Sequence, residues 1–186
     1  MAVSAKTYIE TAITKIEDML KVQLSTYNSP MAESHHPELD DSPLLNEADH
    51  TKFRSLIGCA NWLITLGRFD IAYAVNAFSR FSQAPRQGHL DGMKQVFGYL
   101  KKWTKGAIMI DPKYPDHAQF QAESYEQWRE MYPDTEEDVP TPDQLPEPLG
   151  PKVRITAYKD ADHAHDVVTR RSVTGVLLFL NNTPVK

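Results

Sequence analysis

The chain has 186 residues, of which 41% are hydrophobic, and this is enough for one ordinary domain or two small ones with a modest core. Its single cysteine, Cys59, excludes an internal disulfide framework and a cysteine-based zinc site, and we interpret it as a buried, inert thiol. The sequence contains neither a bilayer-spanning apolar run nor a secretory leader, so we expect an intracellular protein, cytoplasmic or nuclear, with no membrane partner.

The net charge of −5 hides a segregation of charge along the chain. Residues 50–106 contain nine Lys and Arg against two Asp and Glu, whereas residues 1–49 contain three against nine and residues 107–150 contain two against eleven. A basic block can bind phosphates, but solvated helix surfaces are charged too. Charge alone therefore leaves both interpretations open.

The N-terminal part is predicted to form one helix followed by a long loop. Apolar residues at three- and four-residue spacing indicate a helix over residues 5–20, which Ser4 could cap. Residues 28–50 have no period and contain three prolines, which is typical of a loop. Two chemical interpretations of this loop are rejected: a polymerase-type aspartate pair, because no apolar strands flank it, and a metal site, because adjacent histidines point in different directions. The residues concerned are His35, His36, Glu38, Leu39, Asp40 and Asp41.

The basic middle of the chain is predicted to form three more helices. The second helix covers about residues 52–66 and ends at Gly67. The third begins near Asp70, whose carboxylate is expected to bond early backbone N–H groups, and ends before Pro85. The fourth covers about residues 89–103. Short connectors between these helices indicate a compact bundle.

The C-terminal part is predicted to be β structure that follows an acidic linker. Residues 107–111 suit a short strand, and residues 112–151 have a Pro-rich, acidic linker composition with room for one helix near 119–131. Two apolar runs, 153–158 and 173–180, predict an antiparallel hairpin. The fold class is therefore mostly α with a small β part, that is, α+β.

The connector of this hairpin holds the candidate catalytic residues. Asp160 is expected to follow directly on a strand, with Asp162 and Asp166 nearby. Carboxylates fixed at a strand end can hold the divalent ions of phosphodiester chemistry, although three aspartates on one connector cannot all point at one place. A solvated turn is the alternative interpretation.

The run FRSLIGCANWLITLGRFDIAYAVNAFSRFSQAPRQGHLDGMKQVFGYLKK, from Phe53 to Lys102, contains specific motifs. It resembles the segment after the polymerase palm in the Pol polyprotein of copia-type retrotransposons, where an R-S-L-I-G helix leads into an R-x-D-I-A-x-A-V helix and then a helix ending in Y-L-K. The resemblance implies a helical bundle from the thumb and connection of a reverse transcriptase for residues 1–111. It leaves the acidic Pro-rich linker, residues 112–152, unexplained.

The run TAYKDADHAHDVVTRRSVTGVLLFL, from Thr156 to Leu180, is similar to the start of the ribonuclease H domain of the same family. The family's Y-S-D-A-D-W-A-G-D pattern aligns its first metal ligand with Asp160 and its later acids with Asp162 and Asp166. Its R-K-S-T-S-G motif aligns with Arg170, Ser172, Thr174 and Gly175. Residues 153–186 are thus expected to form an incomplete RNase H-like β-hairpin. His163 and His165 depart from the family's Trp and Gly, and His165 could strain a turn that needs positive φ.

The resemblance also implies partners, a cofactor and an activity. The intact family enzyme uses Mg²⁺, but the remaining ribonuclease H carboxylates and the polymerase aspartates are missing here. We therefore expect no activity and no tight Mg²⁺ binding from this chain alone. The implied partners are an RNA/DNA hybrid and the remainder of the Pol polyprotein. The cations expected to track a phosphate backbone are Arg54, Arg80, Arg86, Lys94, Lys101 and Lys102.

Two other functions remain open from the sequence. A catalytically inactive retroelement relic could persist as a helical interaction module, and an unrelated helical adaptor could use the acidic linker to recruit a basic partner. The three tryptophans are interpreted as core or amphipathic surface residues rather than base-stacking platforms; they are Trp62, Trp103 and Trp128.

Overall fold

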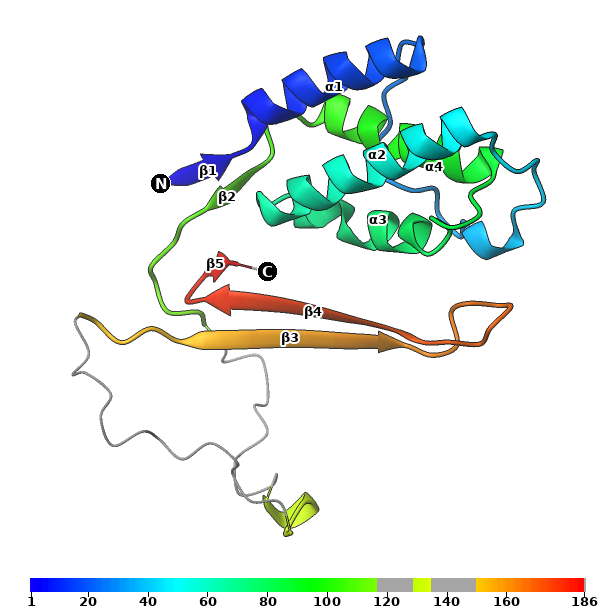
Figure 1. Cartoon of the computed structure of the whole chain (residues 1–186). Helices are drawn as coiled ribbons and strands as arrows, with labels where there is room; N and C mark the ends of the chain where they lie inside the picture. Colours follow the sequence, from blue (N-terminus) through cyan, green and yellow to red (C-terminus); the bar gives the residue numbers. More distant parts are fainter. Residues whose placement is uncertain (117–128, 135–149, 186) are drawn as a thin grey trace, which may run out of the picture.

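The computed structural model describes residues 1–116, 129–134 and 150–185 and is mixed α+β, as the sequence predicts (Figure 1). Four helices lie together, and a long β-hairpin runs beneath them in the view of Figure 1. The helices are α1 (Lys6–Leu20), α2 (Glu47–Thr65), α3 (Ala72–Ser79) and α4 (Gln87–Lys102), with short 3-10 helices η1 (Pro37–Leu39) and η2 (Phe69–Ile71). The strands are β1 (Ala2–Ser4), β2 (Ala107–Met109), β3 (Ile155–Asp162), β4 (Val173–Leu180) and β5 (Thr183–Pro184).

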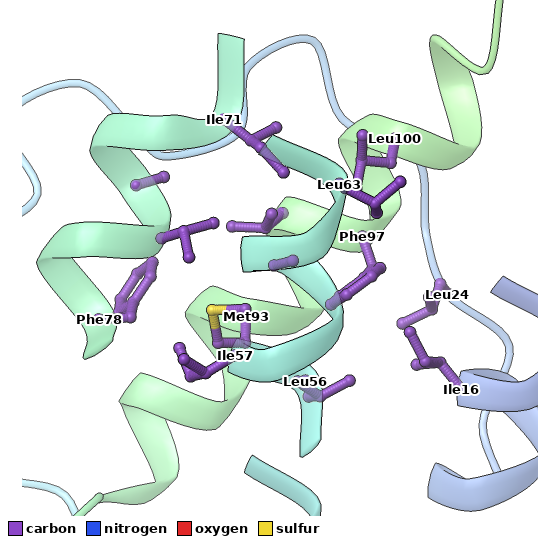
Figure 2. Packing of buried hydrophobic residues seen from close by; sticks show 14 of the residues in the cluster. Ile16, Leu24, Leu56, Ile57, Leu63, Ile71, Phe78, Met93, Phe97 and Leu100 are labelled. Carbon is purple, nitrogen blue, oxygen red and sulfur yellow. The ribbon is translucent and has the colours of Figure 1, made fainter. Parts of the chain in front are cut away.

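The four helices share one apolar core (Figure 2). Each helix contributes the residues that its three- and four-residue spacing places on one face, such as Ile16 from α1, Leu63 from α2, Phe78 from α3 and Phe97 from α4. Leu24, from the segment after α1, closes the core beside Ile16. Burying a side chain of this size contributes about 1.5–3 kcal/mol, so packing rather than helix propensity holds the helices together.

Cys59 lies half-buried between α1 and α2, with its Sγ 3.8 Å from the Tyr8 hydroxyl. Burial raises the pKa of its thiol, so the thiol stays protonated and poorly nucleophilic. The interpretation of Cys59 as an inert thiol therefore agrees with its surroundings.

Two helix boundaries differ from the predictions. The predicted loop extended to residue 50, but α2 already begins at Glu47, because the Asn46 side chain accepts the Asp49 backbone N–H at 2.9 Å and two acidic residues lie in the first turn. Ser4 does not occupy the cap position of α1, which is Ala5; it belongs to β1, although its Oγ accepts the Lys6 N–H at 3.2 Å. Gly67 ends α2 as predicted, with φ of +97°.

The expectation that Asp70 caps the third helix is wrong. Asp70 lies inside η2, and no side-chain cap bond is formed at the start of α3, where Ile71 occupies the cap position. Its carboxylate binds Arg68 and Tyr99 instead. A charged guanidinium is a stronger partner than backbone N–H groups, and its position depends on tertiary packing.

The strands form two small antiparallel sheets. Strand β1 pairs with β2, and the order of the second sheet is β3-β4-β5. The predicted hairpin is present, but β3 extends to Asp162, so Asp160 lies within the strand and opposite Gly175 rather than after the strand end. Strands β1 and β5 were not predicted, because each has three residues or fewer, and β1 also depends on pairing with β2, which is distant in the sequence.

The acidic linker is described only in part. Residues 129–131 are helical, which agrees with the end of the helix predicted near 119–131, and the rest of that prediction lies outside the described residues. The division into regions at 111/112 and 152/153 stays a prediction. Among the described residues, no helix has the length and hydropathy needed to cross a bilayer.

Candidate functional site

Asp160 and Asp162 lie on the same face of β3, because side chains two residues apart in a strand point the same way. Both are exposed. Asp162 Oδ2 lies 2.7 Å from His165 Nδ1, in the loop between β3 and β4. The strand thus presents two carboxylates, of which one already has a partner.

Asp166 differs from these two aspartates because it is buried and bonded within the chain. Its side chain is 1% exposed and accepts a bond from the Arg80 guanidinium, at the end of α3. Its Oδ1 also accepts the backbone N–H groups of Val168 at 3.0 Å and Thr169 at 2.7 Å. Every oxygen of this carboxylate is therefore used within the chain.

These residues do not fit a complete divalent-metal centre. No group of three or more His, Cys, Asp or Glu side chains in residues 1–116, 129–134 and 150–185 is arranged so that it could hold a metal ion. The two adjacent histidines of the loop before α2 do not converge either. The His35 ring lies 5.8 Å from the Phe78 ring, whereas the His36 ring stacks on His165 at 5.5 Å. Adjacent histidines point in different directions, as predicted.

Most of the six predicted phosphate-binding cations have partners within the chain. Five of them bond within the chain: Arg80 to Asp166, Arg86 to the Ser42 carbonyl, Lys94 to Asp91, Lys101 to Glu17 and the Leu24 carbonyl, and Lys102 to Asn28. Arg54 is exposed on α2 and has no carboxylate within ion-pair distance in the described part of the chain. Their binding role stays a prediction, and Arg54 is the best placed of the set.

The outward face of α2 is exposed and almost free of charge. We define this face, the α2 face, by its exposed residues: Thr51, Arg54, Ser55, Gly58, Asn61, Trp62 and Thr65. No Asp or Glu follows Asp49 in the helix, so nothing acidic lies on the face. Arg54, Gly58 and Trp62 are four residues apart and form one row along the helix. Trp62 is 51% exposed, which is unusual for so large an aromatic side chain.

No packing neighbour among the described residues accounts for Gly58. A Cβ at Gly92 would meet the Phe78 ring at 2.2 Å, and one at Gly98 would meet the Ser25 carbonyl oxygen at 2.1 Å, so neighbours account for both glycines. A Cβ at Gly58 would meet nothing within 4 Å. Glycine in a helix interior costs about 1 kcal/mol relative to alanine. The residue therefore leaves the helix backbone bare on the exposed surface that also carries Trp62.

Sequence reasoning missed this face. It included Arg54 but treated Gly58 as part of a motif and interpreted Trp62 as core or amphipathic surface. The available signal was the spacing: a glycine and a tryptophan follow Arg54 at four-residue steps, on the polar side of an amphipathic helix. Trp103 is also half-exposed, at 50%, and Lys102 Nζ lies 5.6 Å from its ring centre. Trp128 lies outside the described residues.

A buried arginine fixes the end of α2 relative to α4. Arg68 is 3% exposed, and its guanidinium donates to both Asp70 oxygens, at 3.0 and 2.7 Å, and to the Trp103 carbonyl at 2.9 Å. The Tyr99 hydroxyl donates to Asp70 Oδ2 at 2.8 Å. Burial and this hydrogen bond raise the pKa of Tyr99, which keeps its hydroxyl a donor.

We expect Asp70 to make the fold sensitive to acid. Burial alone would raise the pKa of its carboxyl, but the hydrogen bonds and charge of Arg68 and the Tyr99 hydroxyl outweigh burial and lower it. The resulting stability is fully present above the unfolded pKa of about 4 and is lost as pH falls through the lower folded pKa. We expect acidification to lower the free energy of unfolding, measured with urea at neutral pH and in acid, by less in Asp70→Asn than in the wild type. Asp91→Asn, on the exposed side of α4, is the control; an unchanged pH dependence in Asp70→Asn would refute this role.

Comparison with curated proteins shows similarity to retrotransposon proteins. The chain is 26% identical over 157 residues to the retrovirus-related Pol polyproteins from transposons RE1 and RE2 of Arabidopsis thaliana, which covers 84% of this chain and 8% of each polyprotein. It is 33% identical over 73 residues to the putative transposon Ty5-1 protein YCL074W of Saccharomyces cerevisiae, which covers 39% of this chain and 21% of that protein. The chain thus spans less than a tenth of the length of the two polyproteins. No protein-family model and no solved structure matches it.

Proposed function

Because this chain is related to the Pol polyproteins of copia-type retrotransposons, we propose that it is part of the reverse transcriptase and ribonuclease H region of such a polyprotein. In this role residues 1–111 form thumb and connection helices that help to hold an RNA/DNA hybrid, and the β3–β4 hairpin begins the RNase H-like domain. Binding a duplex, rather than chemistry, is the function of the chain by itself.

The α2 face is the observation that carries this proposal. A duplex presents rows of phosphates and sugars to a protein, and a surface without carboxylates avoids repelling them. Gly58 allows the helix backbone to approach the sugars closely, since no side chain intervenes. Trp62 offers a broad apolar surface to the sugars and base edges, and Arg54 supplies a cation for one phosphate.

Asp160 is the residue that we assign to metal binding in the intact enzyme. It is exposed on β3, where further carboxylates from outside this chain could join it in holding Mg²⁺. Mg²⁺ needs several oxygen ligands in near-octahedral geometry, and one strand does not provide them. The chain alone is therefore expected to bind a hybrid without cleaving it.

Salt-dependent binding tests the proposal. The full chain is titrated into a fluorescently labelled RNA/DNA hybrid at salt concentrations between about 50 and 200 mM, and the anisotropy gives the affinity. We expect binding that weakens as salt rises, and a salt slope that is smaller by about one in Arg54→Ala because one phosphate contact is lost. Lys113→Ala, at an exposed lysine outside the helices, is the matched control. Absence of binding at the lowest salt concentration would refute the proposal.

A second candidate is an inactive retroelement relic that acts as a helical interaction module. The different partners of the aspartates favour this candidate, because Asp166 bonds to Arg80 and Asp162 pairs with His165, so these two carboxylates do not join Asp160 in one site. This candidate predicts a folded chain with no affinity for the hybrid. The same titration therefore separates the two functions.

A further inference from the structure

The loop between β3 and β4, residues 163–172, contacts the helical part of the chain at three points. The first is the ion pair between Arg80, at the end of α3, and Asp166. The carboxylate is buried, so its charge must be balanced within the protein, and Arg80 is the cation that balances it.

Asp166 also shapes the loop that it anchors. Besides the two backbone N–H groups that its Oδ1 accepts, its own backbone N–H donates to the Arg171 carbonyl at 3.3 Å, and its carbonyl accepts the Arg170 N–H at 2.8 Å. The loop turns through positive φ at Ala164 (+54°) and Arg170 (+58°). One side chain thus holds the loop in shape and fixes it to α3.

The second contact runs through His165. Its Nε2 lies 2.6 Å from the hydroxyl of Tyr73 on α3, and its Nδ1 lies 2.7 Å from Asp162 at the end of β3. The imidazole therefore links α3 to the strand that carries Asp160. His165 does not have positive φ, so the strain that replacement of the family's glycine could cause is absent at this position.

The third contact comes from η1. Glu38 Oε1 accepts the Val167 backbone N–H at 3.2 Å, and the same oxygen bonds His36 Nδ1 at 2.9 Å. The His36 ring in turn stacks on His165, with 30° between the rings. The loop is therefore held by α3 and η1 together.

These contacts hold the hairpin in position relative to the helices, because the strands themselves are largely exposed. Ile155, Val176 and Leu180 are 72%, 56% and 41% exposed, so apolar packing adds little between the hairpin and the helices at these positions. The opposite end of the sheet is held separately, where Thr183 Oγ1 accepts the Asp111 N–H at 2.9 Å and Asn181 Nδ2 donates to the Pro112 carbonyl at 2.8 Å.

We propose that Arg80, Asp166, Tyr73, His165 and Glu38 form a docking clasp that sets the position of β3, and with it Asp160, relative to the helices. Asp166 is in this role a positioning residue rather than a metal ligand, and Arg80 is a docking residue rather than a phosphate contact. Loss of the clasp releases the loop while the helices keep their core, since none of its side chains belongs to that core. The clasp does not depend on nucleic-acid binding.

Hydrogen exchange of the full chain, followed by mass spectrometry, tests the clasp. Arg80→Ala should speed amide exchange in residues 163–172 by about 10-fold or more, because local opening becomes easier, while exchange in α2 and α4 stays unchanged. Asp166→Asn keeps an oxygen for the Val168 and Thr169 N–H groups but removes the charge, so it should give the same result. Combining the two substitutions should add little to the larger single effect. Lys94→Ala removes an exposed pair on α4 and is the control.

Three outcomes would overturn the proposal. The first is unchanged exchange in residues 163–172 of Arg80→Ala. The second is a rise of equal size in α2 and α4, because Arg80 would then support the fold as a whole. The third is a loop that opens in Arg80→Ala but not in Asp166→Asn, since the ion pair would then not hold it. Tyr73→Phe removes only a hydroxyl group and should open the loop more weakly than Arg80→Ala does.

Discussion

Gly58→Val is expected to weaken binding of an RNA/DNA hybrid by about 10- to 100-fold while leaving the free energy of unfolding unchanged or slightly higher. Valine has a stiff, branched side chain that would stand between the α2 backbone and the duplex. Its Cβ would meet no atom of the described residues within 4 Å, so the substitution is expected to fit on the helix surface. It also removes the conformational entropy cost of an exposed helical glycine, of which a net gain of about 0.3 kcal/mol is left after the lower helix propensity of valine.

Loss of affinity together with retained stability distinguishes a binding surface from a packing site. Gly58→Ala should show the same pattern with a smaller loss of affinity, and Trp62→Ala should lose affinity because the apolar contact disappears. Thr14→Val places the same side chain on the exposed side of α1 and is the matched control. Unchanged affinity in Gly58→Val, measured by anisotropy at low salt, would show that the duplex does not approach α2.

His89→Ala is expected to lower the free energy of unfolding by about 3–5 kcal/mol. The imidazole is 2% exposed, and both ring nitrogens are bonded: Nδ1 accepts the Arg86 N–H at 3.0 Å, and Nε2 donates to the Pro37 carbonyl at 2.9 Å. Its ring also stacks on Phe81, with 4.2 Å between centres. Alanine would leave a cavity and two unpaired backbone groups, the Arg86 N–H at the start of α4 and the Pro37 carbonyl in η1.

A second substitution at the same position separates the capping bond of His89 from its bond to Pro37 and its ring packing. Glutamine at the third helical position can bond back to the cap residue, so His89→Gln should lose less stability than His89→Ala. Asp91→Ala, on the exposed side of the same helix, is the control and should change stability by less than about 0.5 kcal/mol. Equal losses in His89→Ala and Asp91→Ala, measured by urea unfolding, would show that His89 does not stabilise the contact between α4 and η1.

The helical core could be predicted from the sequence, since it depends on local periodicity. Leu90, Met93, Val96, Phe97 and Leu100 repeat at helical spacing, and all five are buried. The similarity to copia-type Pol polyproteins was also apparent from the motifs, and the curated relatives confirm it.

Features that depend on distant partners could not be predicted. Asp70 is an ion-pair partner rather than a helix cap, because the distant Trp103 carbonyl holds the buried Arg68 and the distant Tyr99 hydroxyl bonds the Asp70 carboxylate. Strand β1 exists because β2 pairs with it, although more than a hundred residues separate Ala2 from Met109. The clasp likewise joins Arg80 to Asp166 across 86 positions.

The candidate site was predicted in part for the same reason. Asp160 and Arg54 could be named from motif and charge, but their surroundings required tertiary structure. The open space at Gly58 and the burial of Asp166 distinguish a binding surface from a packed one, and the sequence contains neither fact.

The most direct test of the account is to locate the hybrid on the chain by amide chemical shift perturbation in two-dimensional NMR. We predict that the largest perturbations follow the α2 face, at Arg54, Gly58 and Trp62, and that the amides of residues 163–172 are little affected. Perturbations confined to the hairpin or to the C-terminal end of α4, with α2 unaffected, would contradict the assignment of α2 as the duplex-binding helix.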